Sequence, residues 1–302
     1  MPELPDITVY MEAMHERMSG QTLRQVRRNS PFLLRTVEPG LDEARGRRVV
    51  EIRRIGKRIA IGLDNGIWLV LHLMIAGRLH WRKPEASLGA KTSLAAFDFD
   101  HGSLVLTEAG ARKRASLHVM ADGELHILDP GGLEVMDCGL AEFGERLRER
   151  NHTLKRVLTD PRIFSGIGNA YSDEILLAAG LSPVAMSQSL DDEEVSRLFG
   201  AVREQLDLWI NRLRAERGDA FPEKVTAFRG EMAAHGKFGQ PCPHCGTGIQ
   251  RIRHATNETN YCPRCQTGGK LLADRSLSRL LKKDWPRTIE ELEQRTSRDP
   301  AL

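Results

Sequence analysis

Two Cys-x-x-Cys pairs constrain the fold more than any other feature of this sequence. Cys242 and Cys245 form the first pair, and Cys262 and Cys265 form the second. Each pair presents two thiolates from one tight turn, so together they can close a tetrahedral site around one zinc ion. Four thiolates leave no open position on the metal, so we expect a structural ion. Its binding energy then stabilises a segment too small to have its own core.

The segment between the two pairs is typical of a β-hairpin. Alternation over residues 249–254 places Arg251 and Arg253 on the same face, and Asn257 lies near the tip. A cationic hairpin fixed by zinc can probe a DNA groove, although many zinc ribbons bind only protein. The fifth cysteine, Cys138, stands alone, so the pattern favours metal binding over disulfides.

Length and composition indicate an ordinary globular protein. The chain has 302 residues, of which 40% are hydrophobic and 28% charged, so we expect two or three structural units. No apolar run reaches the roughly 18 residues of a membrane span. The first residues include Glu3 and Asp6, which does not fit a secretory signal. Residence in the cytosol is therefore the default expectation.

Positive charge is concentrated in two stretches of the chain. Residues 45–58 contain many arginines and lysines and one acid, Glu51, and residues 228–287 are also predominantly basic. Such clusters attract phosphate groups. Taken singly, each cluster is equally consistent with a solvated surface, and the formal net charge of +3 is only weakly indicative of a nucleic-acid partner.

The N-terminal part is expected to be a helix followed by strands. Apolar residues at helical spacing predict a helix over residues 7–19. Several short strands separated by regular turns then favour a β-sandwich or barrel. The expected strands are 22–28, 48–54, 58–63, 67–73, 78–82, 93–99, 103–107, 116–120 and 124–128.

The pattern becomes helical after a connector that begins near Asp129-Pro130-Gly131-Gly132. We divide the chain into an N-terminal domain, a helical domain, a zinc finger and a C-terminal extension, which makes it a multidomain α+β protein. The expected helices are 141–150, 153–158, 169–179 and 191–217. The expected domains are 1–130, 131–236, 237–270 and 271–302.

Five short motifs occur in order along the chain. They are Pro2-Glu3-Leu4-Pro5-Asp6, Arg54-Ile55-Gly56-Lys57-Arg58, His72-Leu73-Met74-Ile75-Ala76-Gly77, Gly166-Ile167-Gly168-Asn169-Ala170-Tyr171 and Gly239-Gln240-Pro241-Cys242. Methionine before proline is normally removed, so we expect the mature chain to begin at Pro2. Together these motifs resemble those of the formamidopyrimidine-DNA glycosylase and endonuclease VIII family.

The resemblance implies a fold and an activity. The fold is an N-terminal helix and β-sandwich, a helical domain with a helix–two-turn–helix motif, and a C-terminal four-cysteine zinc finger. The activity is that of a bifunctional DNA glycosylase and abasic-site lyase in base excision repair. Its partner is double-stranded DNA with a damaged base or an abasic site, and one structural zinc ion is its only cofactor. We expect a monomer in the bacterial cytosol, close to the nucleoid.

The resemblance also implies roles for individual residues. Pro2 is the nucleophile that forms a Schiff base with the sugar and leads to β,δ-elimination. Glu3 is the proton donor, and Lys57 contacts the phosphate next to the lesion. Ile75, or its neighbour Met74, fills the gap left by the extruded nucleotide. Further contacts to DNA are expected from His72, Lys155, Gly168 and Asn169.

The sequence departs from the family pattern in several places. Asn257 falls where the family usually has a phosphate-binding arginine at the hairpin tip, and Arg251 or Arg253 can compensate. Residues 107–115 supply Arg112 as a cation near the opposite base but lack the family's phenylalanine. Residues 218–236 are short beside the lesion-capping loop of the branch specific for oxidised guanine.

Several alternatives therefore stay open at this point. The lesion can be an oxidised pyrimidine, a ring-opened purine or an abasic site, and the base preferred on the opposite strand is not predicted. The chain can be an abasic-site lyase without glycosylase activity, or a relative that binds damaged DNA without catalysis. A zinc-ribbon adaptor that contacts protein is a further alternative, with residues 271–302 as its docking segment.

Overall fold

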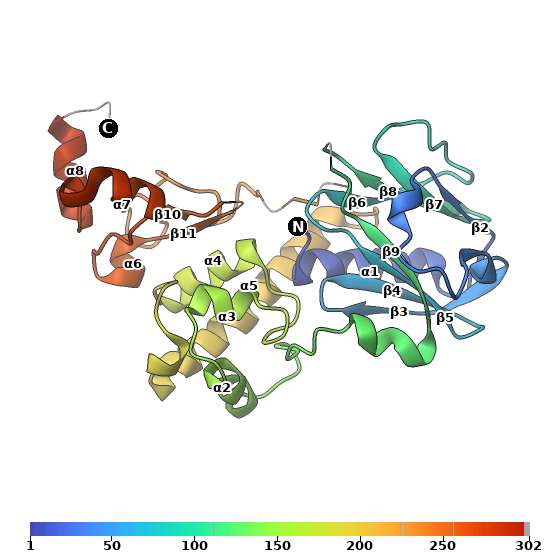
Figure 1. Cartoon of the computed structure of the whole chain (residues 1–302), viewed down its shortest axis with the longest axis horizontal. Helices are drawn as coiled ribbons and strands as arrows, with labels where there is room; N and C mark the ends of the chain where they lie inside the picture. The colour runs from blue at the N-terminus through green and yellow to red at the C-terminus, as the bar shows by residue number, and fades with distance from the viewer. Residues whose placement is uncertain (111, 224, 227, 256, 299–302) are drawn as a thin grey trace. The chain divides into compact units, whose positions relative to one another are not determined.

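The computed structural model in Figure 1 describes residues 1–110, 112–223, 225–226, 228–255 and 257–298. Contacts between residues divide the chain into two compact units. The first comprises Met1–Gly132 and Asp207–Ala227, and the second comprises Leu133–Leu206 and Phe228–Leu302. We describe each unit by itself.

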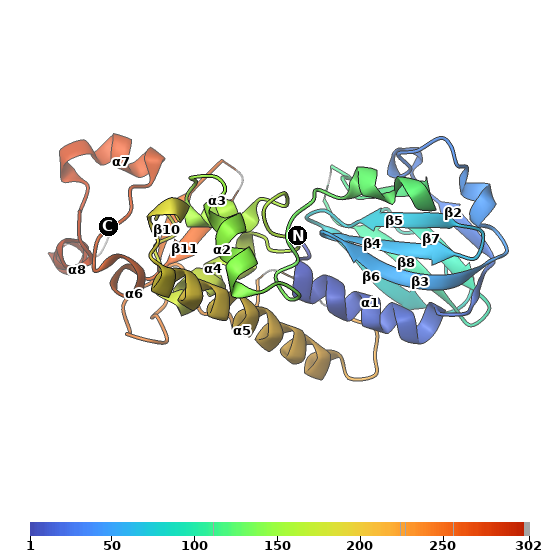
Figure 2. The ribbon, with the colours of Figure 1, turned by 90° about the horizontal axis from the view of Figure 1, so that it is seen from below.

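The first unit is a β-sandwich with the helix α1 (Leu4–Met18) and the C-terminal part of a second long helix. Both sheets are antiparallel, as Figure 2 shows for the cyan and teal strands. The five-stranded sheet has the order β1 (Thr22–Leu23), β3 (Arg47–Ile55), β4 (Arg58–Leu63), β5 (Ile67–His72) and β9 (Ser116–Ala121). The four-stranded sheet has the order β2 (Gln25–Arg28), β7 (Ser93–Phe99), β8 (Gly102–Glu108) and β6 (Gly77–Arg82).

Apolar residues of both sheets and of α1 form one core. Tyr10 and Met14 from α1, Leu69 from β5, and Phe97 and Leu106 from the second sheet are all fully buried in it. Burial of each such side chain contributes about 1.5–3 kcal/mol to folding. This core fixes α1 against β3 and β4, and thereby fixes the position of the chain's N-terminus on the sandwich.

Two of the expected strands differ from the structure. Residues 22–28 do not form one strand, because β1 and β2 belong to different sheets and the chain crosses between them at Arg24. The strand expected over 124–128 is wrong, because Asp122–Leu128 is a 3₁₀ helix. Leu125 and Leu128 are three residues apart, the period of a 3₁₀ turn, and both pack in a small cluster outside the main core.

The second unit begins with four helices. They are α2 (Leu140–Arg148), α3 (Leu154–Thr159), α4 (Asn169–Ala179) and α5 (Asp192–Arg217), whose C-terminal part belongs to the first unit. The bounds predicted for α4 are confirmed: Gly168 precedes it, and Gly180 ends it with a left-handed φ of 63°. Phe143 and Phe164 stack with their ring centroids 4.7 Å apart in the helical core.

The zinc-finger segment contains the predicted hairpin. Its strands are β10 (Gln250–Arg253) and β11 (Glu258–Tyr261), and α6 (Pro263–Thr267) follows. The tail adds α7 (Arg275–Leu281) and α8 (Ile289–Arg298) and packs on this segment. The Leu272 amide donates to the Tyr261 hydroxyl at 2.7 Å, and the Ile289 amide donates to the Gly269 carbonyl at 2.9 Å.

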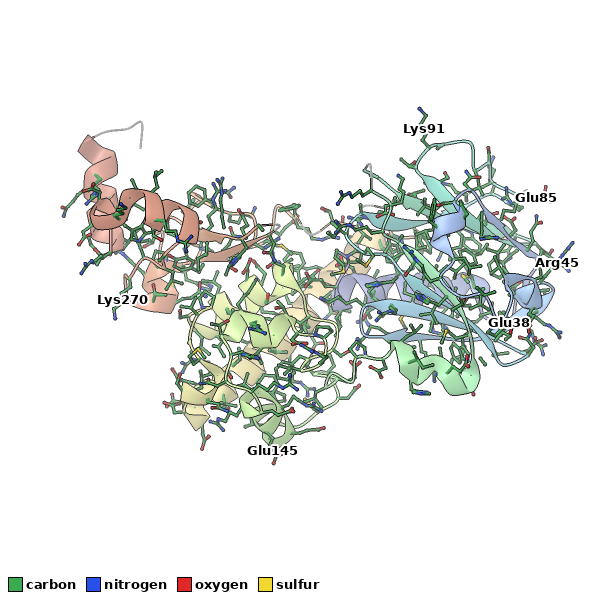
Figure 3. All side chains as sticks on the ribbon, in the orientation of Figure 1. Glu38, Arg45, Glu85, Lys91, Glu145 and Lys270 are labelled. Atoms are coloured by element: carbon green, nitrogen blue, oxygen red, sulfur yellow. The ribbon has the colours of Figure 1, made fainter. Side chains whose placement is uncertain are left out.

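The expected α+β class is confirmed. Among the described helices, none is long and apolar enough to cross a membrane. Charged side chains cover the outside of each unit, as Figure 3 shows for Glu38, Arg45 and Lys91 on the sandwich and for Glu145 on α2.

Candidate active site and nucleic-acid interface

The first residues of the chain are buried at the start of α1. Pro2 is buried, and Glu3 and Asp6 are each only 3% exposed. Glu3 is the N-cap of α1, and its backbone amide donates to the Asp6 carboxylate at 3.0 Å in a capping box. The cap therefore holds two acids in fixed positions next to Pro2.

Burial of the amino terminus favours a neutral amine. Burial lowers the pKa of the Met1 amine, and the positive charges of Arg78 and Lys57 act in the same direction. The negative charges of Glu3 and Asp6 oppose this effect. An unprotonated amine is the form that can act as a nucleophile.

Lys57 lies in the tight turn between β3 and β4. The sequence motif predicts a strand lysine, whereas the structure has Gly56 and Lys57 as the turn itself, with Gly56 at φ 59°. The Arg54 guanidinium donates to the Gly56 carbonyl at 2.8 Å and thereby braces this turn. Lys57 is half-buried, and its charge acts on the N-terminal amine.

His72 ends β5 beside these cations. It pairs with Arg58 of β4 and with Ser116 of β9. Burial lowers the pKa of His72 to about 4, and the charges of Arg58 and Lys57 contribute to the same shift. The imidazole is therefore neutral at neutral pH, so it offers a phosphate a hydrogen bond and no full positive charge.

The turn after β5 carries both candidate wedge residues. The Gly77 amide donates to the Leu73 carbonyl at 2.9 Å, and a Cβ at Gly77 would lie 2.2 Å from that carbonyl oxygen, so only glycine fits. Met74 has a left-handed φ of 54° and is half-buried, whereas Ile75 is 57% exposed. A side chain that enters the base stack must be accessible, and this condition favours Ile75.

Glu108 organises the loop that contains Arg112. Its carboxylate is 1% exposed and accepts hydrogen bonds from the amides of Arg114 and Ala115, the shortest at 2.8 Å. The Lys113 ammonium donates to the Glu108 carbonyl. Arg112 is exposed, so in this loop it is accessible to a ligand.

The N-terminus of α4 is joined to the zinc hairpin. Gly168 is its N-cap, and the first helical residue, Asn169, donates from its side-chain amide to the Glu258 carbonyl of β11 at 2.9 Å. Backbone amides at a helix N-terminus favour anions. The Asn169 contact therefore fixes the hairpin beside a group suited to phosphate binding.

Lys155, in contrast, points into the protein. Its ammonium lies 2.5 Å from the Asp173 carboxylate and donates to the Asn169 carbonyl at 2.7 Å. Only 13% of the Lys155 side chain is exposed. The contact between Lys155 and DNA that the motif suggests stays a prediction. In this structure the lysine instead pairs with Asp173 and binds a backbone carbonyl.

The hairpin presents its cations in two different ways. Ile252 is buried, so Arg251 and Arg253 share the opposite face as predicted. The Arg251 guanidinium lies 4.0 Å from the Phe238 ring centroid and 3.4 Å from the Glu258 carboxylate. Arg253 and Asn257 are exposed, and the Asn257 carbonyl accepts the His254 amide at 2.8 Å to close the tip.

The four cysteines converge as a zinc site requires. Their Sγ atoms all lie within 4.8 Å of one another, with 3.9 Å between Cys242 and Cys265 and 3.4 Å between Cys245 and Cys262. A tetrahedral zinc ion with thiolates at about 2.3 Å needs sulfur atoms about 3.8 Å apart. The donor set and its spacing therefore fit one Zn²⁺.

Family models match most of the chain. The N-terminal domain of formamidopyrimidine-DNA glycosylase matches residues 1–131, its helix–two-turn–helix (H2TH) domain matches 133–215, and a zinc finger found in these glycosylases and in isoleucyl-tRNA synthetases matches 239–268. The formamidopyrimidine-DNA glycosylase of Heliobacterium modesticaldum is 34% identical over 281 residues, which cover 88% of this chain and all of the relative. The chain belongs to the formamidopyrimidine-DNA glycosylase family.

Solved structures of this family agree with the fold. The Thermus thermophilus protein is 31% identical, with a TM-score of 0.73 over 88% of this chain and 98% of the relative. A Lactococcus lactis glycosylase bound to DNA with an abasic site is 24% identical, with a TM-score of 0.76 over 88% of this chain and 99% of the relative, and supports the fold alone. The predicted family, the glycosylase class of enzyme and the single structural zinc ion are thereby confirmed.

Sequence reasoning missed several polar residues in this glycosylase. Asp173 and Glu174 of α4 are buried, Asp173 contacts His235 at 2.8 Å, and Glu174 accepts three backbone amides of residues 233–235. His80, which the motifs leave as an ordinary position, contacts Glu223 at 2.7 Å. Acidic residues in a helix are normally exposed to solvent, so the sequence gives no indication that Asp173 and Glu174 are buried.

Proposed function

We propose that this glycosylase removes damaged bases from duplex DNA and then cleaves the strand at the abasic site, with the amine of Pro2 as its nucleophile. The observation that carries the proposal is the buried start of α1, where Pro2 adjoins Glu3 and the pKa of the amino terminus is lowered. Removal of Met1 leaves a secondary amine in this environment. Burial is the largest cause of the lowered pKa of the Met1 amine, and the buried position of Pro2 favours an unprotonated amine in the same way.

The reaction proceeds through an iminium ion. The lone pair of the Pro2 nitrogen attacks C1′ of the sugar, and the bond between C1′ and the base breaks. Glu3 supplies a proton as the sugar ring opens. The cationic iminium acidifies the C2′ proton, whose loss expels the 3′ phosphate. A second elimination expels the 5′ phosphate, and hydrolysis of the iminium returns the Pro2 amine.

Other residues of the sandwich unit bind and open the DNA. Lys57 contacts the phosphate next to the lesion as a point charge, and neutral His72 donates a hydrogen bond to the backbone. Ile75, with Met74 behind it, fills the gap left by the extruded nucleotide. Exposed Arg112 approaches the opposite strand.

The second unit holds the duplex. The amides that begin α4 at Gly168 and Asn169 bind phosphate, and the zinc hairpin adds Arg253 and Asn257 at its exposed end. Arg251 stacks on Phe238 and supports the hairpin's shape. We propose that these roles are divided among domains with the bounds 1–130, 131–236, 237–270 and 271–302. We also propose that the protein acts as a monomer in the bacterial cytosol.

The relatives support a proposal for the substrate class. They are named for ring-opened purines, and solved complexes of similar proteins contain Fapy-dG, carbocyclic 8-oxo-G or an abasic site in DNA. We propose ring-opened purines as the first substrate class of this chain. The short segment 218–236 makes oxidised guanine a weaker substrate, because less chain is available to cover the extruded base.

Incision of labelled duplexes tests the proposal. The panel contains a ring-opened guanine, 8-oxoguanine, an oxidised pyrimidine and an abasic site. Wild-type protein should release the base and leave phosphates at both ends of the gap, and Pro2→Gly and Glu3→Gln should abolish base release. Glu38→Gln, an exposed acid of the same unit, is the matched control and should be unaffected. Incision only at abasic sites would leave a lyase, and binding without incision would overturn the proposal.

A further inference from the structure

The second unit contains a buried ion-pair network. Asp173 of α4 is 1% exposed, and its two carboxylate oxygens face different partners. One oxygen lies 2.5 Å from the Lys155 ammonium of α3, and the other lies 2.8 Å from Nδ1 of His235. The Asn260 side-chain amide of β11 also approaches the second oxygen, at 3.5 Å. One carboxylate thus joins α3, the segment before the zinc finger and the hairpin.

The neighbouring acid holds the same segment through its backbone. Glu174 is 4% exposed and accepts the amides of Ala233 and Ala234 at 2.8 Å and the amide of His235 at 2.9 Å. Asp173 and Glu174 are adjacent in α4, so their bonds to side chain and backbone fix His235 from two directions.

Two further hydrogen bonds extend the network to the start of α4. Lys155 donates to the Asn169 carbonyl at 2.7 Å, and the Asn169 side chain donates to the Glu258 carbonyl of the hairpin at 2.9 Å. The N-terminus of α4, which is suited to a phosphate, and the zinc hairpin are therefore held by one connected set of bonds.

The Lys155 ammonium already has partners within this network. Its ammonium has three N–H donors, and two partners on the protein take the shortest contacts. A buried carboxylate without its cation is costly, so Asp173 retains Lys155 strongly. A phosphate that recruited Lys155 would have to compete with Asp173 at 2.5 Å and would take the lysine cation away from one oxygen of this buried carboxylate.

We propose that Asp173 is a positioning residue for DNA binding, and that Lys155 and His235 act through it. The network sets the spacing between the phosphate-binding start of α4 and the zinc hairpin, and Lys155 itself makes no phosphate contact. This inference rests on the proposed function, since it assigns the parts of the same DNA grip. The proposed positioning role replaces the direct contact between Lys155 and a DNA phosphate that the motif suggests.

The salt dependence of DNA affinity separates the two roles. Each lysine that contacts a phosphate contributes about 0.9 to the slope of log K against log salt. Lys155→Met should weaken binding to an abasic-site analogue about tenfold and leave the slope unchanged, because the hairpin and the start of α4 keep their phosphate contacts but are no longer held in advance at the spacing that DNA requires. Lys57→Met should lower the slope by about 1. Lys270→Met, at an exposed lysine of the zinc-finger segment, is the matched control and should retain the wild-type affinity.

A double-mutant cycle tests the role of Asp173. Asp173→Asn should weaken binding to the same degree as Lys155→Met, and the double variant should be no weaker than either single variant. A drop in slope of about 0.9 for Lys155→Met, or additive losses in the double variant, would overturn the inference. Failure of the wild-type protein to bind the duplex, or an unchanged slope for Lys57→Met, would instead count against the proposed function.

A measurement on the wild-type protein covers the case in which these variants do not fold. Acetylation of lysines with a small reagent, read by mass spectrometry, should be slow at Lys155 with or without DNA. Lys57 should become protected only when DNA is bound. Rapid acetylation of Lys155 in the free protein that DNA suppresses would contradict the inference.

Discussion

Charged side chains have different roles in the two units. In the sandwich unit, Lys57 and Arg78 lie around the amino terminus and bias its pKa. In the second unit, Lys155 is paired with a fully buried Asp173 and donates to the backbone carbonyl of Asn169. The first arrangement tunes the reactivity of one group, whereas the second holds pieces of chain together.

This difference shows why a motif does not fix a role. Lys57 and Lys155 both match basic positions of the family, and both are expected from sequence to contact DNA. Their surroundings differ, because one lies in a tight turn near the nucleophile and the other lies 2.5 Å from a buried acid. The predictions that follow sharpen or break this contrast, from the largest expected effect to the smallest.

Removal of zinc should abolish DNA binding while it leaves the sandwich unit folded. The four thiolates hold a segment whose hairpin is joined to α4, and structural zinc binding is worth about 10–16 kcal/mol in small fingers. Cys262→Ser should lower DNA affinity at least about 100-fold. Fluorescence anisotropy with a labelled duplex measures this, and circular dichroism follows the β-sandwich.

The lone cysteine provides the control for that experiment. Cys138 is buried outside the metal site, so Cys138→Ser should keep both zinc and DNA affinity. Tight DNA binding by metal-free protein would contradict the link between the finger and the α4 grip.

Loss of the turn lysine should impair the chemical step and binding together. Lys57→Ala removes a cation that acts on the amino terminus and a proposed phosphate contact, so we expect kcat/KM for incision to fall about 100-fold. Single-turnover incision measures the effect. Arg45→Ala, at an exposed arginine of the same basic stretch, should change the rate less than about threefold. Equal losses in both variants would mean that the sandwich unit contributes only diffuse charge.

We expect Ile75, the exposed residue of the turn after β5, to fill the gap that the extruded nucleotide leaves in the base stack. Ile75→Ala should slow incision of a damaged base about tenfold, because an unfilled gap in the base stack costs a few kcal/mol, part of which other contacts offset. Met74→Ala should have a smaller effect, since Met74 is half-buried and Ile75 is 57% exposed. Base-pair opening reported by 2-aminopurine fluorescence would locate the step. The reverse ranking would assign the wedge to Met74.

The smallest effect concerns the dependence of stability on pH. The pKa of His72 is about 4 in the folded protein because of burial and of Arg58 and Lys57, whereas that of an unfolded histidine is about 6.5. The His72 contribution is fully present above pH 6.5 and decreases as the pH falls towards 4, where the unfolded chain alone takes up a proton. His72→Asn should therefore reduce the loss of unfolding free energy between about pH 7.5 and about pH 5.8 by about 1 kcal/mol.

Urea unfolding at both pH values measures this difference. His126→Asn, at an exposed histidine, is the control and should follow the wild-type profile. A His72 variant with the full wild-type pH dependence would contradict the neutral, buried imidazole.

Much of the fold could be predicted from the sequence because its patterns are local. The strands 58–63 and 93–99 and the helix 169–179 have the predicted bounds, since turns or glycines mark both ends. The prediction for 22–28 was wrong in treating it as one strand, because the crossing between sheets at Arg24 depends on partners distant in sequence. For 124–128, apolar residues that pack outside the main core override the strand pattern.

The candidate site was predictable where chemistry depends on residue type, as for the four cysteines and the N-terminal Pro2-Glu3 pair. It was not predictable where function depends on which buried groups meet. Nothing in the sequence brings Asp173 to Lys155 and His235, which come from three separate segments. The same is true of the environment that makes His72 neutral.

The central claim is that the Pro2 amine attacks the sugar, and borohydride trapping tests it most directly. Zinc-loaded protein with Met1 confirmed absent is incubated with an abasic-site duplex and reduced, and the cross-linked peptide is mapped by mass spectrometry. We expect the DNA to be attached to the nitrogen of Pro2, and the complex to disappear in Pro2→Gly. A cross-link to a lysine such as Lys57, or undiminished trapping with Pro2→Gly, would contradict the account.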